Sequence, residues 1–493
     1  MHDGDGEKCG DGGRPTGPSA AAAALRNHHC GIARSFRFHR PRGAFCHAGW
    51  CQQCRVATPD GPRLACQRDA REPAQLRCAD TLRPIGRYAE QLPPWFHERV
   101  IQPEALRQPF LDWLRSLSAA PRASPCVMRG RGKRRDLTCW TLVAGGGLSG
   151  LRAAKAIAET GRDVLLIEAE RLGGRAAFDP HRRHEIEPAI VAARTAGVRM
   201  REDALVAGLY EEPRRALVTT AAGPIIIGFE DLVVATGSYD RLPAFPGNDL
   251  PGIIGAGAFA RLLAVDALPP GATIVLAGSA EGVAVVQSTA RAHGVVIAHH
   301  HVGVPIAVDG RRWLTRVRFT GNEAVPADLL VLALRQPSYE LILQAGCTAT
   351  VAGDPVTVMP VGLPVMPLLT VGSAAVGDLG STGPEALAAF LSGSVTAYTA
   401  RPAPLAAPPA PQSFACLCED VRIGDLDAAI RDGFDDMELL KRRTGACTGP
   451  CQGKLCHGEV AACLARHGKR VALPTQRPFS RPVLLAEMAE PAP

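Results

Sequence analysis

Aromatic residues, long apolar runs and a secretory leader are what this sequence has little of. Phe, Trp and Tyr make up only 5% of the 493 residues and do not alternate with basic residues, which argues against the stacking platforms of nucleic-acid-binding proteins. No apolar run reaches the roughly 18 residues that a membrane-spanning helix needs. The N-terminus, MHDGDGEKCGDGG, lacks the basic start and apolar stretch of a secretory signal. We therefore expect a cytoplasmic protein with no transmembrane segment and no nucleic-acid partner.

Cysteine, by contrast, is abundant, with 16 residues in the chain. In a reducing compartment cysteines do not pair into a disulfide framework, so this number indicates metal binding. The chain is too long for one hydrophobic core and predicts several domains. Its net charge of +7 is modest for this length, and the one basic cluster, Arg129–Arg135, is interpreted as a solvated linker in preference to a binding surface.

The first group of cysteines is Cys46, Cys51, Cys54 and Cys66, with the spacing C-x4-C-x2-C and a fourth cysteine beyond. This is the pattern of plant-type ferredoxins, which bind a [2Fe–2S] cluster through four thiolates. Gly49 allows the loop to turn inward and to direct backbone N–H groups at sulfur. Zinc is less favoured because only Cys51 and Cys54 form the C-x2-C unit common in zinc sites. Incidental free cysteines are the remaining alternative.

A second group of four cysteines lies near the C-terminus and comprises Cys416, Cys418, Cys451 and Cys456. These cysteines surround a helix expected over residues 423–433. Their spacing is unusual for zinc and differs from the plant-type loop. From the residues alone, the group indicates a metal site, with iron–sulfur favoured, or a dithiol pair. Cys447 is either a fifth ligand or a spare thiol.

Between the two groups, the sequence GGGLSG has the glycine spacing of a dinucleotide-binding turn. It follows an apolar strand expected over residues 138–144, opens an Ala-rich helix, and is followed by Glu168 at the end of the next strand. Gly145 allows the tight turn, Gly147 lets the backbone approach a pyrophosphate, and Gly150 lets helix and strand pack closely. The helix N-terminus favours phosphate, and Glu168 would accept a hydrogen bond from a ribose hydroxyl. The alternative is a Gly-rich turn with no ligand.

A second βαβ unit begins near Thr273, and its second strand is expected over residues 295–298. Its turn keeps the first glycine, Gly278, but we align Ala280 with the second glycine, where a methyl group would crowd a pyrophosphate. This half is therefore expected to be a scaffold and not a nicotinamide site. The histidines at 299–301 are interpreted as a polar loop edge, because neighbouring side chains on a strand alternate faces and cannot all reach one metal.

The expected organisation follows from these motifs and from shifts in composition. Within the N-terminal region, Ser35–His39 alternates like a strand. The expected segments are a disordered stretch over 1–19, an N-terminal cysteine domain with a helical extension over 20–120, a basic linker over 121–136, a dinucleotide-binding domain over 137–400 with a nested second one over about 241–365, a Pro/Ala linker over 401–413, a C-terminal cysteine domain over 414–475 and a tail over 476–493.

Several stretches of the sequence resemble sarcosine oxidase alpha-type subunits. These are SFRFHRPRG and GWCQQC near the first cysteines, ATGS and PGNDLPG in the middle, and LKRRTG and GPCQG near the last cysteines. The group includes opine oxidase A subunits and the flavin and iron–sulfur components of hydrogen cyanide synthase. The resemblance covers most of the chain, from about Ser35 to Leu485.

The resemblance implies an α/β fold in which a two-dinucleotide-binding, Rossmann-like FAD/NAD(P) flavoprotein core is flanked by two [2Fe–2S] domains. The N-terminal domain would be ferredoxin-like, and the C-terminal one would be a small helical domain similar to bacterioferritin-associated ferredoxin. Each cysteine group would bind one cluster. FAD would lie near Gly145, Gly147, Leu148, Ser149, Gly150, Glu168, Gly174, Arg175, Thr236, Gly237, Gly372 and Ser373. The family's usual Gly-Asp appears here as Gly372-Ser373, which leaves NAD as an alternative.

The implied function is that of an electron-transferring subunit in a heteromeric amine oxidase or dehydrogenase. Its partner would be a beta-type flavoprotein subunit, and its substrate a small amine of the sarcosine, opine, glycine or proline type. No nucleophile–base pair accompanies the motifs, so no catalytic residue is named. Two alternatives stay open: an NAD(P)H-dependent flavin reductase that feeds its own clusters, and a non-catalytic scaffold that binds NAD and clusters.

Overall fold

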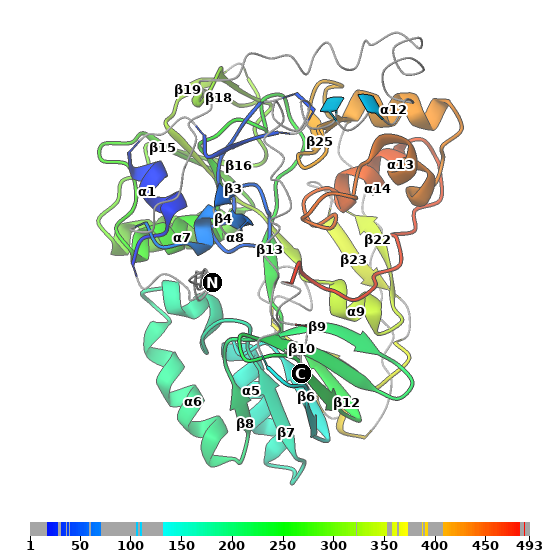
Figure 1. The fold of residues 1–493 in the computed structure, drawn as a ribbon. Coiled ribbons are helices and arrows are strands. Elements are labelled where there is room, and N and C mark those ends of the chain that lie inside the picture. The colour runs from blue at the N-terminus through cyan, green and yellow to red at the C-terminus, as the bar shows by residue number, and fades with distance from the viewer. Residues whose placement is uncertain are drawn as a thin grey trace, which may run out of the picture.

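The structure of the protein is a computed structural model. It describes residues 17–27, 31–35, 37–38, 40–58, 61–70, 105–106, 109–110, 132–321, 323–352, 357–361, 364–372, 387, 390–392, 408–483 and 488. Figure 1 shows two lobes: the lower lobe holds the first dinucleotide-binding half, and the upper lobe holds the second half together with the N-terminal and C-terminal segments. No helix of the described part has both the length and the apolar character to cross a bilayer.

The first half is a parallel sheet packed between helices and a second sheet. The parallel strands have the order β24 (Leu368–Thr370), β12 (Asp231–Val234), β6 (Thr141–Ala144), β7 (Val164–Ile167) and β8 (Arg199–Arg201). Successive residues of β6 face opposite layers, as strand geometry requires. Val143 packs under the helices α5 (Leu148–Ala158) and α6 (Ile186–Thr195). Leu142 packs against the sheet of β5 (Arg135–Thr138), β11 (Ile225–Gly228), β10 (Arg215–Thr220) and β9 (Ala204–Tyr210).

The second half repeats this plan with fewer strands. Its parallel sheet has the order β14 (Ile253–Gly255), β20 (Leu329–Ala333), β15 (Ile274–Gly278) and β16 (His299–Val302). Helices α7 (Ala256–Ala264) and α8 (Ala280–Ala292) and the small sheet β17 (Ala307–Gly310), β18 (Leu314–Arg318) and β19 (Ala324–Pro326) complete it. The two halves are joined by the antiparallel pair β13 (Ser238–Asp240) and β21 (Arg335–Pro337).

Strand β16 corrects one prediction, because it lies at the histidines and not at residues 295–298. Val296 is 79% exposed, and pairing with β15 begins only at His299, opposite Val275. The histidines therefore form the strand and are not a loop edge. His299 and His301 share one face and stack against the buried Phe319, with ring centroids 5.4 and 4.3 Å away. Aromatic packing explains these two histidines without a metal.

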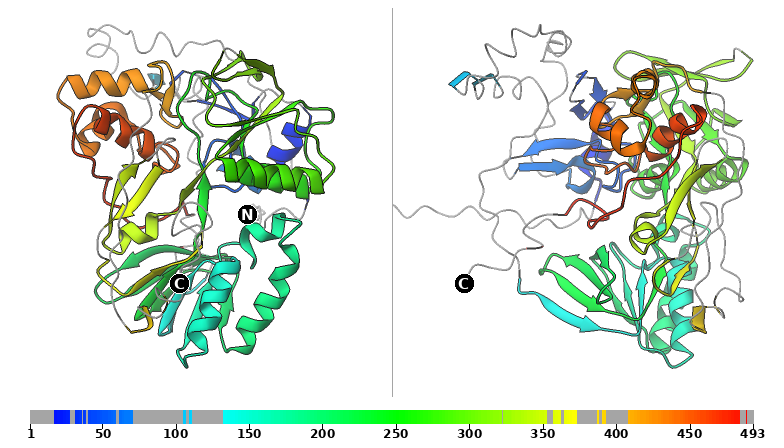
Figure 2. Two further views of the ribbon diagram at one scale, coloured as in Figure 1. Left: turned by 180° about the vertical axis from the view of Figure 1, so that it is seen from behind. Right: turned by 90° about the vertical axis from the view of Figure 1, so that its right-hand side faces the viewer.

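The N-terminal segment, residues 17–70, and the C-terminal segment from residue 408 to α14 both lie in the upper lobe in Figures 1 and 2, and hydrogen bonds join them. The N-terminal segment contains α1 (Ala20–Arg26), the hairpin-like pairs β1 (Ala33–Arg34) with β2 (Pro41–Arg42) and β3 (Arg55–Thr58) with β4 (Gly61–Leu64), and the short helix η1 (Ala65–Gln67). The C-terminal segment contains β25 (Phe414–Cys416), β26 (Val421–Arg422), α12 (Ile423–Arg431), α13 (Met437–Thr444) and α14 (His457–Arg466). Between the lobes lie α9 (Glu340–Gln344) and the hairpin β22 (Thr348–Ala352) with β23 (Thr357–Val361).

The strand expected over Ser35–His39 is wrong in position. The strand is β1, which ends at Arg34, and Arg37 and Phe38 lie in a turn. The backbone N–H groups of both turn residues donate to the same carboxylate oxygen of Asp420, each at 2.9 Å. A residue near the other end of the chain therefore holds this turn, and no local pattern could reveal it.

The predicted fold class is confirmed: the chain is an α/β protein with a Rossmann-like core of two similar halves and short cysteine-bearing segments at both ends. Helix α12 confirms the helix expected over 423–433, although it ends at Arg431. Most of residues 1–19, residues 71–104 and residues 111–131 lie outside the described residues, and so do most of the expected helical extension and basic linker.

Candidate redox centre

The thiols of the first cysteine group converge where the loop between β2 and β3, which carries three of them, meets η1, which carries the fourth. Their residues are Cys46, Cys51, Cys54 and Cys66, all at most 7% exposed. The Cys46 sulfur is hydrogen-bonded by the thiols of Cys51 and Cys66, and Cys66 also contacts Cys54. Burial opposes ionisation of Cys46, but these hydrogen bonds outweigh burial, so the pKa of its thiol lies well below the usual value. Four buried sulfurs around one point are a donor set that fits a [2Fe–2S] cluster.

The loop backbone also faces the sulfurs. The N–H groups of Ala48 and Cys51 both donate to Cys46 Sγ at 3.4 Å. Gly49 between them has φ +79°, which a residue with a side chain rarely adopts, and a Cβ there would lie 2.2 Å from Gln67 Nε2. The loop can therefore turn inward as the sequence predicts and place N–H dipoles against a thiolate.

The second cysteine group converges in the same way, but from two different elements. Cys416 and Cys418 belong to the β25–β26 hairpin, whereas Cys451 and Cys456 lie in the loop before α14, and all four are at most 4% exposed. Thiol contacts link Cys418 to Cys451, Cys451 to Cys456 and Cys456 to Cys416. Hydrogen bonds from Cys418 and Cys456 hold the pKa of the Cys451 thiol well below its usual value. This donor set also fits a [2Fe–2S] cluster.

Cys447 lies beside the second group as a fifth thiol. Its sulfur accepts a hydrogen bond from Cys456 Sγ at 3.6 Å, and this contact, against the effect of burial and with help from His457, lowers the pKa of Cys447 to about 6. His457 in turn meets the Tyr339 hydroxyl at 2.8 Å. Cys447 therefore lies in contact with the second cysteine group. This position is compatible with both sequence interpretations, a fifth ligand and a spare thiol.

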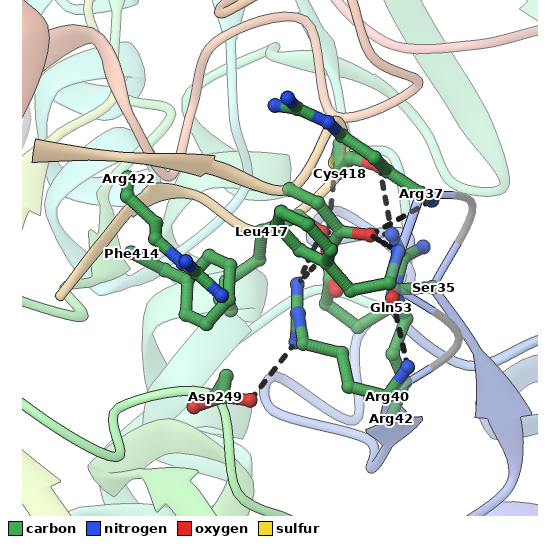
Figure 3. A network of polar contacts seen from close by, with 12 residues as sticks. Ser35, Arg37, Arg40, Arg42, Gln53, Asp249, Phe414, Leu417, Cys418 and Arg422 are labelled. Carbon is green, nitrogen blue, oxygen red and sulfur yellow. Dashed lines mark hydrogen bonds and ion pairs between the residues drawn. The ribbon is translucent and has the colours of Figure 1, made fainter. Parts of the chain in front are cut away.

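The two cysteine groups are neighbours in space, which the sequence did not predict. The Gln53 side chain, between Cys51 and Cys54, donates from Nε2 to Cys418 Sγ of the other group at 3.3 Å. Figure 3 shows this contact beside a polar junction built around Arg40, Arg42 and Leu417. The guanidinium of Arg40 donates to the Leu417 carbonyl at 2.8 Å, and that of Arg42 to the carbonyls of Leu417 and Cys418, both at 2.7 Å.

Asp420 anchors this junction. Its carboxylate is fully buried and forms a 2.6 Å ion pair with Arg40, whose side chain is 8% exposed. Burial alone would raise the pKa of Asp420, but Arg40, Ser35 and the Phe38 N–H outweigh it and hold the pKa below its usual value. A paired charge with this many donors fixes the hairpin that carries Cys416 and Cys418 against the N-terminal segment.

The dinucleotide turn has the geometry that its glycines predict. Gly145 has φ +113°, and a Cβ there would lie 2.3 Å from the Ala235 carbonyl oxygen. At Gly150 a Cβ would lie 2.0 Å from the Gly145 carbonyl oxygen, whereas at Gly147 a Cβ would meet nothing within 4 Å. The first and last glycines are thus required by packing, and the middle one faces open space at the N-terminus of α5. That open space fits a pyrophosphate.

Most other residues expected around the dinucleotide lie close to this turn. Glu168 Oε2 accepts from Gly146 N at 2.6 Å, and Gly173 N donates to Gly146 O, which brings Gly174 and Arg175 alongside. A Cβ on Gly372 would lie 2.6 Å from Ser149 Oγ. The buried Arg175 Nη1 has no hydrogen-bond partner among the described residues, as a group that awaits a ligand would. Ser373 lies outside the described residues.

Strand β13 connects this turn to both cysteine groups. It starts directly after Thr236 and Gly237, and Arg175 Nη2 donates to the carbonyl of its first residue, Ser238, at 2.5 Å. Its second residue, Tyr239, is buried and packs on Trp50, the neighbour of Cys51, with ring centroids 5.0 Å apart.

The same strand is reached from the second cysteine group. Lys454, from the loop between Cys451 and Cys456, lies 5.9 Å from the Tyr239 ring centroid. The Tyr239 hydroxyl donates to Glu340, and Glu340 pairs with Lys454 at 3.3 Å. One short strand therefore contacts residues that neighbour each of the three expected cofactor positions.

Sequence reasoning missed Gln53, Tyr239 and Asp420, because their partners lie hundreds of positions away. Cys463 belongs to neither cysteine group, and its spacing to the other cysteines matches no metal-binding pattern. Cys463 and His467 lie four positions apart at the end of α14, and both donate to Asp427 Oδ1 of α12, at 3.0 and 2.9 Å. The i,i+4 spacing could have revealed the shared face. These two hydrogen bonds account for the group without a metal.

Comparison with known protein families identifies three parts of the chain. Residues 14–80 match the 2Fe-2S iron-sulfur cluster binding domain, residues 143–197 the NAD(P)-binding Rossmann-like domain, and residues 410–491 the sarcosine oxidase A3 domain. The predicted resemblance and the predicted cofactor classes, iron–sulfur and dinucleotide, are thereby confirmed.

Individual relatives agree with these domains. The sarcosine oxidase alpha subunit of Rhizobium meliloti is 24% identical over 96% of this chain and 56% of its own length. The opine oxidase A subunit of the same organism is 34% identical over 18% of this chain and 20% of its own length. The chain thus spans about half of the first relative and a smaller part of the second.

A solved structure shares the fold. In the crystal structure of L-proline dehydrogenase from P. horikoshii, 81% of that chain superposes on 73% of this one with a TM-score of 0.58 and 22% identity. The chain therefore combines a 2Fe–2S domain, a Rossmann-like dinucleotide-binding core and a sarcosine oxidase A3 domain, and it is homologous to the sarcosine oxidase alpha and opine oxidase A subunits.

Proposed function

We propose that this chain is the electron-transferring subunit of a heteromeric amine oxidase or dehydrogenase, with FAD at the Gly145 turn and one [2Fe–2S] cluster in each cysteine group. The observation that carries the proposal is the convergence of the Gly turn and both cysteine groups on β13. Bound FAD would supply the change from a two-electron oxidation of an amine to single electrons, which iron–sulfur clusters accept. The similarity to the sarcosine oxidase alpha and opine oxidase A chains supports a secondary or substituted amine as the substrate class.

The residues of the chain would have separate tasks in this function. The N-terminus of α5 would bind the pyrophosphate, Glu168 would accept from a ribose hydroxyl, and Arg175 would contact the dinucleotide next to β13. The packed Trp50 and Tyr239 rings exclude water between the turn and the first cysteine group. Burial raises the pKa of the Tyr239 hydroxyl far above its usual range, so Tyr239 stays protonated.

We infer a beta-type flavoprotein partner because both relatives are themselves subunits of larger enzymes. The test is to express the chain with and without such a partner, and to measure FAD, iron and acid-labile sulfide per chain. About four iron atoms are expected with two [2Fe–2S] clusters. Oxidation of sarcosine, proline, glycine or an opine should require both proteins.

Two results would replace this proposal by the alternatives. Rapid bleaching of the flavin by NADH in the isolated chain would favour an NAD(P)H-dependent reductase. A chain that binds clusters and NAD but no FAD, even with its partner, would favour a scaffold.

A further inference from the structure

The side chain of Gln53 is the one direct link between the two cysteine groups that the described hydrogen bonds contain. Its backbone lies between Cys51 and Cys54 of the first group. Its amide nitrogen donates to the Cys51 carbonyl at 3.2 Å and to Cys418 Sγ of the second group at 3.3 Å. The residue is 3% exposed, so water does not compete for either contact.

We propose that Gln53 raises the reduction potential of the cluster bound by the second cysteine group, here called the second set. We also propose that Gln53 couples this cluster to the cluster of the first group, the first set. This inference rests on the proposed function, in which both sets hold a [2Fe–2S] cluster. A hydrogen bond to a cluster thiolate stabilises the reduced form, which carries one more negative charge, and therefore raises the reduction potential. A buried amide dipole has a large effect because little solvent screens it.

The contact has the rigidity that a fixed potential requires. Cys418 follows the Leu417 carbonyl that Arg40 and Arg42 both hold, and Asp420 pins the other side of the same hairpin. Gln53 itself is tied to the Cys51 carbonyl, so neither partner can turn away without breaking a second bond. The Cys418 sulfur and its donor are therefore each held in place by further hydrogen bonds.

The coupling follows from the same geometry. Gln53 belongs to the loop that carries Cys51 and Cys54, so the donor at Cys418 is held by the same loop that would hold the first cluster. With a cluster bound in each set, one electron would pass from the reduced cluster to the oxidised one, with no bond made or broken and no proton moved. The direction of transfer is then set by the difference between two potentials, of which Gln53 raises one.

The test is a redox titration of the full chain, followed by electron paramagnetic resonance of the reduced clusters, in the native protein and in Gln53→Met. Methionine keeps the length and burial of the side chain but removes the donor. We expect the reduction potential of the second set to fall by about 59 mV. For a one-electron couple this corresponds to about a tenfold lower ratio of reduced to oxidised cluster at a given potential. The first set should shift less. A Cys418→Ser variant, which alters only the second set's signal, assigns the two signals.

Gln52→Asn is the matched control, because Gln52 lies one position earlier in the loop and its amide bonds the Gly49 carbonyl at 2.7 Å instead of a cluster sulfur. It should leave the second set's potential unchanged. If Gln53→Met assembles no cluster, Gln53→Asn, whose shorter amide no longer reaches Cys418, is expected to lower the potential in the same way. Two assembled clusters with unmoved potentials would overturn the inference about Gln53 alone, whereas iron for only one cluster in the native chain would overturn the proposed function.

Discussion

The two dinucleotide-binding halves share one plan but treat the N-terminus of their first helix in opposite ways. In the first half, Gly147 is the N-cap of α5, and it brings no side chain to the helix N-terminus. In the second half, Ser279 is the N-cap of α8, and its hydroxyl accepts from Gly282 N at 3.1 Å. The second turn is also one residue shorter, so Ser279, and not Ala280, occupies the place of the middle glycine. The serine hydroxyl accepts a hydrogen bond from an N–H group that would otherwise be free to donate to a phosphate.

The halves also differ at the end of the next strand. Glu168 follows β7 and returns to the turn, whereas Gly303 follows β16 and provides no carboxylate. The comparison indicates that the first half is built to hold a nucleotide. The second half instead provides surfaces for the chain ends: Arg241, directly after β13, pairs with Glu459 of α14 at 2.9 Å.

The largest expected effect tests this docking role. In Arg241→Met, the carboxylate of Glu459, whose side chain is 5% exposed, loses its buried cation. We expect a loss of about 3–5 kcal/mol in the free energy of unfolding, because a buried charge is left without its partner. Urea unfolding followed by circular dichroism measures it. Arg318→Met is the matched control in the same half, since Arg318 and Asp309 form a solvent-exposed pair whose loss should change stability little. Equal losses in the two variants would refute the docking role.

The next effect compares one glycine in each half. A Cβ on Gly150 would lie 2.0 Å from the Gly145 carbonyl oxygen, and a Cβ on Gly282 would lie 2.4 Å from the Ala333 carbonyl oxygen. We expect Gly150→Ala and Gly282→Ala each to cost about 1–3 kcal/mol through overpacking. Only Gly150→Ala should also lower the FAD content of the purified chain. Equal FAD loss in both variants would mean that the second half also holds a nucleotide.

Sequence alone predicts those parts of the fold that depend on neighbouring residues. The apolar strand before Gly145, the glycine turn and the first cysteine spacing each have a local physical reason. The turn lies where the pattern indicates, and the strand expected over residues 138–144 ends there as predicted but begins only at Thr141, because Thr138 ends β5 of the neighbouring sheet. The start of β16 was misplaced because residues 295–298 are apolar yet half-buried or exposed, and only Ala298 N, at the end of this run, bonds to β15, through the Ile274 carbonyl at 2.9 Å. An apolar run in the sequence shows only which residue types are present. Whether they form a strand depends on hydrogen bonding to a partner strand.

The candidate site shows the same division. Eight cysteines and the turn could be named from spacing and resemblance, but their convergence could not. The contact between Gln53 and Cys418 joins residues 365 positions apart, and Tyr239 gives no motif of its own. The cap at Ser279 was also misaligned, because a one-residue difference in turn length is visible only when the helix start is known.

A smaller effect is expected when the N-cap residues of α5 and α8 are exchanged by substitution. Gly147 has φ −66° and ψ 172°, which serine adopts without strain, and a Cβ there meets nothing within 4 Å. Gly147→Ser should therefore leave the fold intact while its hydroxyl takes the N–H group meant for phosphate. We expect at least a tenfold weaker affinity for FAD, about 1.4 kcal/mol, measured by fluorescence titration of the nucleotide-free chain. Ser279→Gly should cost only a few tenths of a kcal/mol in stability and leave FAD affinity unchanged.

The smallest effect concerns pH and Glu168. Burial raises the pKa of the Glu168 carboxyl above its usual value, although N–H groups of Glu170 and Gly146 partly offset this. Because the folded pKa exceeds the unfolded one, this group's contribution to stability of the nucleotide-free chain is complete below the unfolded pKa. It is lost as the pH rises through the folded pKa. Affinity for FAD should follow the opposite trend, since the ionised carboxylate is the better acceptor for a ribose hydroxyl.

Glu168→Gln removes the titration and keeps the shape. Relative to this variant, the native nucleotide-free chain should lose stability as the pH rises through the raised pKa, while its FAD affinity increases. Denaturant unfolding and FAD titration over the same pH series measure the two trends. Parallel trends, or equal pH dependence in the variant, would show that Glu168 does not face the ribose. The functional contrast between the halves would then rest on the helix cap and the turn, without Glu168.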